Sequence, residues 1–241
     1  MTTLPACIPP SCAEESTDPH DESLDERQRL REAIVEEALG LAPFDGLSQA
    51  TLIKAAVQAG LAPMEAERLL PGGVEEALDV YTTRLDRELR SRARQADLAA
   101  MRVHERIIWL VMTRLEQMAP HKEALRRAIA MRALPWNAPS TCRDVWHVSN
   151  LMWRLAGDAS TDFNYYTKRT LLAEVYVTTV LCWLQDSEPE HEATRAFLER
   201  RVAEVLRFGK QLGQCSNRVS QTVERVTDQW VQRRRYRTKR T

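Results

Sequence analysis

The sequence of 241 residues predicts an all-α protein, built as a bundle of about ten helices. Glycine is scarce, with 8 residues in the chain, which disfavours strand-and-turn folds and glycine-rich phosphate loops. Apolar residues recur with helical period almost everywhere after residue 24, and prolines and glycines stand where the periodic segments stop. No uncharged apolar run reaches the roughly 18 residues that a membrane span needs.

Caps and breakers divide the chain into its expected helices. Ser48 is placed as an N-cap, and Gly60 as the stop of the helix that it opens. Ser23 and Glu26 have capping-box spacing before the first helix, and Pro43 and Gly46 are expected to end it. The expected helices span 24–41, 48–59, 63–70, 74–94, 101–118, 121–134, 140–156, 167–186, 189–209 and 218–236.

The helix expected at 167–186 differs from the others in composition. Its stretch 170–184 carries one charge, Glu174, and is apolar almost all round. A helix with this composition is usually the buried centre of a bundle. The stretch is too short to cross a bilayer.

The net charge of zero hides an asymmetry between the two ends. Residues 1–26 hold seven acids and no Lys or Arg, whereas residues 217–241 hold eight bases and two acids. Segment 1–23, rich in Pro, Ser, Thr and acid, is predicted to be a disordered acidic tail. The basic end makes a polyanionic surface the natural partner for that part of the chain.

Two short helices at 48–59 and 63–70 have the lengths and the turn of a helix-turn-helix. The pattern from Thr51 to Leu61 resembles the start of that motif in TetR-type regulators. Residues 62–79, however, contain five acids and a single base, Arg68, and this charge would repel DNA phosphates. We expect a degenerate motif and no nucleic-acid partner, with a TetR-class ligand-responsive transcription regulator as the alternative.

Catalytic and metal motifs are missing from the sequence. Glu188 and His191 have the spacing of a di-iron ligand pair, but no other histidine has a Glu three residues before it. No nucleophile elbow or P-loop occurs. We therefore expect no enzyme activity, no metal and no cofactor.

The last expected helix is amphipathic and ends in a basic run. Val219, Val223, Val226 and Trp230 form one apolar stripe, and Arg233 begins the basic run. This combination is typical of a helix that lies in a membrane interface. A bundle helix with a solvated tail, or a nucleic-acid-binding tail, are the alternatives.

The segment from Gly157 to Tyr176 reads GDASTDFNYYTKRTLLAEVY. It resembles a signature of the ubiquinone (coenzyme Q) biosynthesis accessory proteins, the ninth of the coenzyme Q set, which are lipid-binding relatives of the TetR regulators. The resemblance extends over roughly 25–210. Further segments that agree with the family are 43–46, 69–73, 126–135, 184–187 and 196–202.

This resemblance implies a TetR-like fold with a division into four parts. An N-terminal unit of three or four helices at 24–97 would follow the acidic tail, and a helical lipid-binding domain would span 98–212. Segment 213–241 would hold the amphipathic membrane helix. The fold is often dimeric, so a homodimer is one alternative.

The resemblance also implies a function without catalysis. Members bind a polyprenyl quinone precursor, or a phospholipid, and present it to the demethoxyubiquinone hydroxylase at the membrane. A helical scaffold without lipid cargo is the remaining alternative. Because residues 1–26 lack the Arg of a mitochondrial presequence, we expect a cytoplasmic protein, peripheral on the inner membrane of a bacterium.

Three groups of site residues are expected. The hydroxylase surface would include Asp162, Tyr165, Tyr166 and Arg169, although the family commonly has Trp where Tyr165 stands. The lipid cavity would be lined by apolar and small side chains, namely Met112, Trp153, Leu172, Val175, Tyr176, Thr179 and Trp183. The membrane surface would be Val223, Val226, Trp230, Arg233, Arg234 and Arg235.

Overall fold

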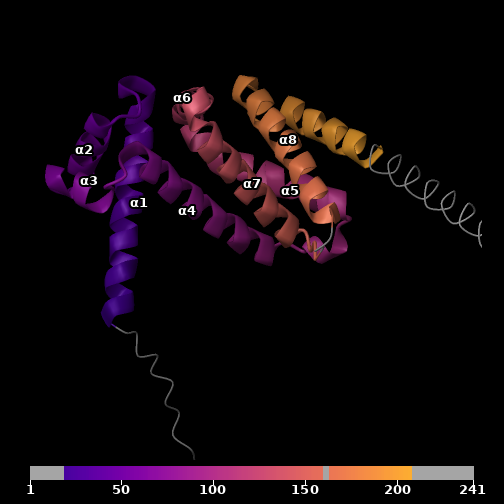
Figure 1. The fold of residues 1–241 in the computed structure, drawn as a ribbon, viewed down its shortest axis with the longest axis horizontal. Helices are drawn as coiled ribbons and strands as arrows, with labels where there is room; N and C mark the ends of the chain where they lie inside the picture. The colour runs from indigo at the N-terminus through magenta and orange to yellow at the C-terminus, as the bar shows by residue number, and fades with distance from the viewer. Residues whose placement is uncertain (1–18, 160–162, 208–241) are drawn as a thin grey trace, which may run out of the picture. The chain divides into compact units, whose positions relative to one another are not determined.

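The computed structural model describes residues 19–159 and 163–207, which form helices and contain no strand (Figure 1). The helices are α1 Pro19–Asp45, α2 Gln49–Gln58, α3 Pro63–Leu69, α4 Gly73–Gln95, α5 Val103–Met118, α6 Lys122–Arg132, α7 Ala138–Leu155 and α8 Phe163–Gln185, followed by a helix at 192–207. The predicted all-α class is confirmed. The predicted helix at 218–236 lies outside the described residues.

The chain divides into two compact units, and the boundary in the sequence lies between Thr82 and Thr83. In the first unit α1 packs against α2 and α3 around buried residues such as Ile34, Leu52 and Leu69. The Ser48 hydroxyl accepts a 3.2 Å hydrogen bond from the Thr51 amide, as its predicted role as an N-cap of α2 requires. Gly60 stops α2 with φ at 78°, a backbone conformation that favours glycine.

The first helix is longer than the sequence pattern predicted at both ends. It begins at Pro19 instead of residue 24, because proline at the first helical turn loses no hydrogen bond. It also continues through Pro43 to Asp45. In the last turn this proline removes one N–H donor only, and the helix ends where Gly46, with φ at 75°, donates to the Ala42 carbonyl.

In the second unit, α8 packs against α7 and α5. It runs beside the 192–207 helix in the opposite direction (Figure 1), and Arg201 of that helix pairs with Glu174. The composition of residues 170–184 predicted a helix buried on all sides. For α8 this prediction is wrong. A stripe with steps of four, four, three and four residues is exposed along α8, namely Tyr166, Thr170, Glu174, Val177 and Leu181. Apolar composition thus indicated the α8 helix but not the extent of its burial.

Asp186 fixes the start of the 192–207 helix. Its Oδ2 accepts hydrogen bonds from the Thr194 hydroxyl at 2.6 Å and the Thr194 amide at 3.1 Å, while its Oδ1 accepts from the Glu188 amide at 2.9 Å. The Thr194 hydroxyl, and then these backbone donors, hold the pKa of the Asp186 carboxyl below its usual value. The carboxylate therefore acts as the N-terminal cap of this helix.

A buried ion pair joins three helices of the second unit. Arg114 of α5 lies 2.8 Å from Asp86 of α4, and both side chains are buried. The other oxygen of Asp86 lies 2.9 Å from His147 Nε2 of α7. Removing one member of such a pair leaves an uncompensated charge in the interior, which is costly.

Substitution Asp86→Ala is therefore expected to lower the free energy of unfolding by about 3–5 kcal/mol, measured by urea denaturation. The matched control is Asp45→Ala, which breaks the exposed pair between Asp45 and Lys54 and should cost about 0–1 kcal/mol. Equal small losses for both variants would contradict a structural role for the buried pair.

Candidate functional site

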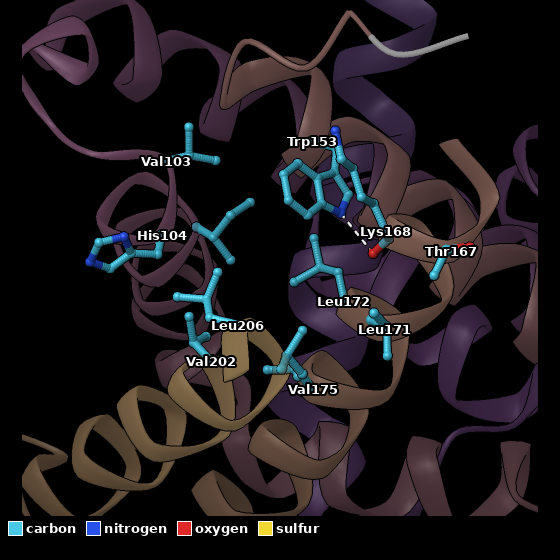
Figure 2. A pocket seen from close by; sticks show the side chains of 12 residues that line it. Val103, His104, Trp153, Thr167, Lys168, Leu171, Leu172, Val175, Val202 and Leu206 are labelled. Atoms are coloured by element: carbon cyan, nitrogen blue, oxygen red, sulfur yellow. Dashed lines mark hydrogen bonds between the residues drawn. The ribbon is translucent and has the colours of Figure 1, made fainter. Parts of the chain in front are cut away.

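A cavity of about 450 Å³ lies in the second unit between α5, α7, α8 and the 192–207 helix (Figure 2). Its size is within the range of small-molecule sites. Aliphatic side chains make up most of the lining, namely Val103, Ile107, Leu171, Leu172, Val175, Val202, Val205 and Leu206. Val103 and Leu206 are exposed, so the cavity opens to the surface at these two residues.

Three of the predicted lipid-binding residues line this cavity: Trp153, Leu172 and Val175. The indole of Trp153 faces the aliphatic residues of α5 and the 192–207 helix across the cavity (Figure 2). Its Nε1 donates a 2.9 Å hydrogen bond to the Lys168 carbonyl, which fixes the ring between α7 and α8. The polar end of Trp153 is therefore satisfied, and its apolar face remains for a ligand.

The other four predicted residues are buried but do not line this cavity: Met112, Tyr176, Thr179 and Trp183. The Tyr176 hydroxyl donates to the Met118 sulfur at 3.9 Å, and burial raises the Tyr176 pKa. The Thr179 hydroxyl donates to the Val175 carbonyl at 2.6 Å. These contacts give Tyr176 and Thr179 structural roles in the interior.

Two walls of the cavity were missed by sequence reasoning. Val103 and Ile107 come from the start of α5, while Val202 and Leu206 come from the 192–207 helix. Both pairs have the spacing of four residues that places side chains on one helix face. That spacing was a signal in the sequence, but only the structure brings the two faces together.

The polar groups at the cavity are already engaged or turned away. Lys168 Nζ lies 2.7 Å from Asp158 Oδ1 and 5.6 Å from the centre of the Trp153 ring. The imidazole of His104 is directed away from Trp153 (Figure 2). The interior thus presents mainly apolar surface, which suits an apolar ligand better than a charged one.

Three aromatic rings gather where the middle of α7 meets the start of α8. Tyr165 and Tyr166 are 5.1 Å apart between ring centres, and Trp146 of α7 lies 6.5 Å from the first and 6.0 Å from the second. Tyr166 is 63% exposed. We call these three residues the aromatic cluster. Trp146 was not predicted, whereas the predicted neighbour Asp162 lies outside the described residues.

Arg169 lies beneath the aromatic cluster instead of on its surface, with 1% of the residue exposed. Its guanidinium stacks 3.4 Å from the centre of the Tyr165 ring, and its Nη1 donates to the Tyr165 carbonyl at 3.0 Å. Nε of Arg169 donates to Asn150 Oδ1 at 2.8 Å. Arg169 therefore holds Tyr165 in place and is not available to contact a partner directly.

Helices α2 and α3 carry one basic side chain each. Lys54 of α2 pairs with Asp45 at 2.7 Å. Arg68 of α3 donates to Glu65 at 2.7 Å, and this hydrogen bond raises the Arg68 pKa. Both cations are therefore engaged by carboxylates of the same unit.

Residues 19–159 and 163–207 contain neither a candidate metal cluster nor a membrane-spanning helix. No group of three or more His, Cys, Asp and Glu side chains in this part is arranged to hold a metal ion. None of the helices described there is both long and apolar enough to cross a membrane. The predicted membrane-surface residues 223–235 lie outside the described part of the chain.

The arrangement of helices is that of the TetR class. It matches the crystal structure of a TetR transcriptional regulator from Nitrosomonas europaea with a TM-score of 0.62 at 22% sequence identity, covering 73% of this chain and 97% of that one. At this level of identity the match concerns the fold. The predicted TetR-like fold is confirmed.

Within this class, residues 138–209 match the COQ9 family. The mitochondrial ubiquinone biosynthesis protein COQ9 of Homo sapiens is 34% identical over 195 residues, which cover 78% of this chain and 61% of that protein. The corresponding proteins of Rattus norvegicus and Drosophila melanogaster are 30% and 29% identical, with 83% of this chain and 66% and 63% of theirs covered. This chain belongs to the COQ9 family. It spans less than two thirds of the length of these three relatives.

The acidic character of α3 predicts that the protein does not bind duplex DNA. In gel-shift titrations at about 50 and 200 mM salt, no complex with a steep salt dependence should form. The double variant Glu65→Lys and Glu67→Lys, which reverses the charge of α3, is the positive control and should gain non-specific, salt-sensitive binding. A specific complex with the native protein would instead support the ligand-responsive regulator.

Proposed function

We propose that this protein is a non-catalytic lipid-binding accessory factor of ubiquinone biosynthesis, with a polyprenyl quinone precursor bound in the α5–α8 cavity. The apolar cavity carries the proposal. Most of its lining, from Trp153 to Leu206, falls within the residues that match the COQ9 family. The names of the curated relatives, ubiquinone biosynthesis proteins, supply the chemical class of the ligand.

The physical basis is the transfer of an isoprenoid tail out of water. Burying apolar groups gains about 0.8 kcal/mol for each CH₂, so a few isoprene units suffice for strong binding. The exposed residues Val103 and Leu206 at the edge of the cavity leave an opening through which a longer tail or the head group can extend. Nothing in this scheme requires a catalytic residue of this chain.

Presentation of the lipid needs a surface for the enzyme that consumes it. We assign this role to the aromatic cluster, with Tyr166 as its exposed centre, and we propose the demethoxyubiquinone hydroxylase as the partner. Aromatic side chains are enriched at the energetic centres of protein interfaces, which supports this choice. Asp162 would flank the surface, and Arg169 would act by supporting Tyr165.

The segment 218–236 is proposed to hold the protein at the membrane. Its apolar stripe Val223, Val226 and Trp230 would enter the interface, and Arg233, Arg234 and Arg235 would face anionic lipid. We further propose a cytoplasmic, peripheral location on a bacterial inner membrane. A homodimer is compatible with this scheme and is not required by it.

The lipid assignment predicts that protein purified from membrane-containing cells retains a prenyl quinone precursor or a phospholipid, detected by native mass spectrometry. Leu206→Asp places a carboxylate at the edge of the cavity and should weaken binding of a short-tailed demethoxyubiquinone by about tenfold or more, because it removes the burial of one Leu side chain.

Leu181→Asp is the matched control for this test. Leu181 is 46% exposed, compared with 45% for Leu206, but it does not line the cavity. Binding measured by tryptophan quenching should therefore remain at the native level. If the native protein carries no lipid and binds none of the probe, the scaffold without cargo is the correct alternative.

The membrane assignment predicts that the triple variant Arg233→Gln, Arg234→Gln and Arg235→Gln floats poorly with liposomes that contain anionic lipid. At about 1 kcal/mol for each base, the partition constant should fall roughly 100-fold. The control variant Arg92→Gln, Arg94→Gln and Arg143→Gln removes three exposed charges from the helical body and should float normally. Equal flotation of the two variants would refute an interfacial role for the basic run.

A further inference from the structure

The cavity and the aromatic cluster meet in a five-residue segment at the start of α8. Thr167 and Lys168 line the cavity, and Tyr165 and Tyr166 belong to the aromatic cluster. Arg169 follows Lys168 in the sequence, and its side chain is buried. Both features therefore depend on how this segment of α8 is held against the end of α7.

On the cavity side, the segment is held through Lys168. The Lys168 carbonyl accepts the indole hydrogen bond of Trp153, and its ammonium group lies above the Trp153 ring and 2.7 Å from Asp158 Oδ1. A ligand that packs against Trp153 therefore contacts a ring that Lys168 holds by two interactions, one through its carbonyl and one through its ammonium group.

On the surface side, the segment is held through Arg169. Its Nη1 lies 3.2 Å from Asp158 Oδ2 and also donates to the Tyr165 carbonyl, while its planar face covers the Tyr165 ring. Asn150 Oδ1 accepts from both the Arg169 Nε and the Tyr165 hydroxyl, at 2.8 and 3.2 Å. A shift of the guanidinium therefore moves the Tyr165 ring, and with it the contacts to Trp146 and Tyr166.

Asp158 joins the two sides, because each of its oxygens binds a different cation. Its side chain is 6% exposed, so these interactions lie largely out of water, where they are strong and sensitive to geometry. Rotation of the carboxylate cannot improve one contact without changing the other. The residue follows Gly157, whose φ of 89° shapes the turn directly after α7.

We propose that Asp158 couples occupancy of the cavity to the geometry of the aromatic cluster, so that the protein with ligand presents a different surface from the empty protein. This inference rests on the proposed lipid-binding function and adds a mechanism by which a partner distinguishes loaded from empty protein. By thermodynamic reciprocity, a partner that prefers the loaded surface also strengthens ligand binding by the same factor. Asp158 and Arg169 are positioning residues in this scheme and contact neither ligand nor partner.

The test uses the full chain labelled with 5-fluorotryptophan and the isoprenoid alcohol farnesol as the probe. Fluorine NMR reports Trp153 in the cavity and Trp146 in the aromatic cluster separately, after assignment with Trp146→Phe and Trp153→Phe. In the native protein both resonances should move together on titration, although Trp146 does not line the cavity.

Asp158→Asn leaves one acceptor oxygen where there were two, so it cannot hold both cations. In this variant farnesol should still move the Trp153 resonance, while the movement of Trp146 is lost. Arg169→Lys keeps the charge but removes the stacked guanidinium plane and the second set of donors. In this variant too, farnesol should move the Trp153 resonance and not the Trp146 resonance. It serves as the test if Asp158→Asn folds poorly. Asp144→Asn, which breaks the ion pair of α7 with Arg132, is the matched control and should respond as the native protein does.

The outcomes separate this inference from the lipid-binding function on which it rests. If Trp153 moves in the native protein and Trp146 does not, the coupling is overturned and the cavity remains a binding site. The coupling is also overturned if Trp146 moves equally in native protein and Asp158→Asn. If neither resonance responds in the native protein, the cavity takes no isoprenoid, and the proposed function fails together with the coupling.

Discussion

The contact between the end of α7 and the start of α8 is the constraint on which the rest of the second unit depends. Asp158 binds Lys168 and Arg169, while Arg106 of α5 donates at 2.8 Å to the Ala156 carbonyl just before the turn. A Cβ on Gly157 would lie 3.2 Å from the Arg106 guanidinium, so this position leaves little room for a side chain. The turn thus anchors three helices, and both the cavity and the aromatic cluster take their shape from it.

The helices of the first unit are set by residues whose role lies in the backbone. Ser48 and Gly60 still define α2, and Pro63 still opens α3, because these residues serve the backbone. The charged side chains of α3, by contrast, are mainly acidic, with Glu65 and Glu67 beside Arg68. Fold and binding chemistry are therefore encoded by different residues, and the fold alone does not indicate the ligand.

Sequence reasoning predicted the helical class, most helix boundaries and the family, because caps, breakers and the segment at 157–176 are local signals. It placed Trp153, Leu172 and Val175 at the future cavity but could not separate them from Tyr176 and Thr179. Leu172, Val175, Tyr176 and Thr179 share one apolar helix, α8, and only the neighbouring helices decide which of its side chains face a cavity. The contacts of Asp158 and Arg169 could not be predicted for the same reason, since they join segments from different helices.

The lining that the 192–207 helix contributes to the cavity differs from the lining that α8 contributes. Leu172 and Val175 belong to the packed interior of α8, whereas Val205 and Leu206 stand on a helix that begins at the Asp186 cap and that Arg201 ties to α8. Substitutions on this outer helix can enlarge or narrow the cavity without disturbing the charge pairs of the core. Under the proposed lipid-binding function, tail-length preference would therefore be set by a few positions on this helix, such as Val205 and Leu206.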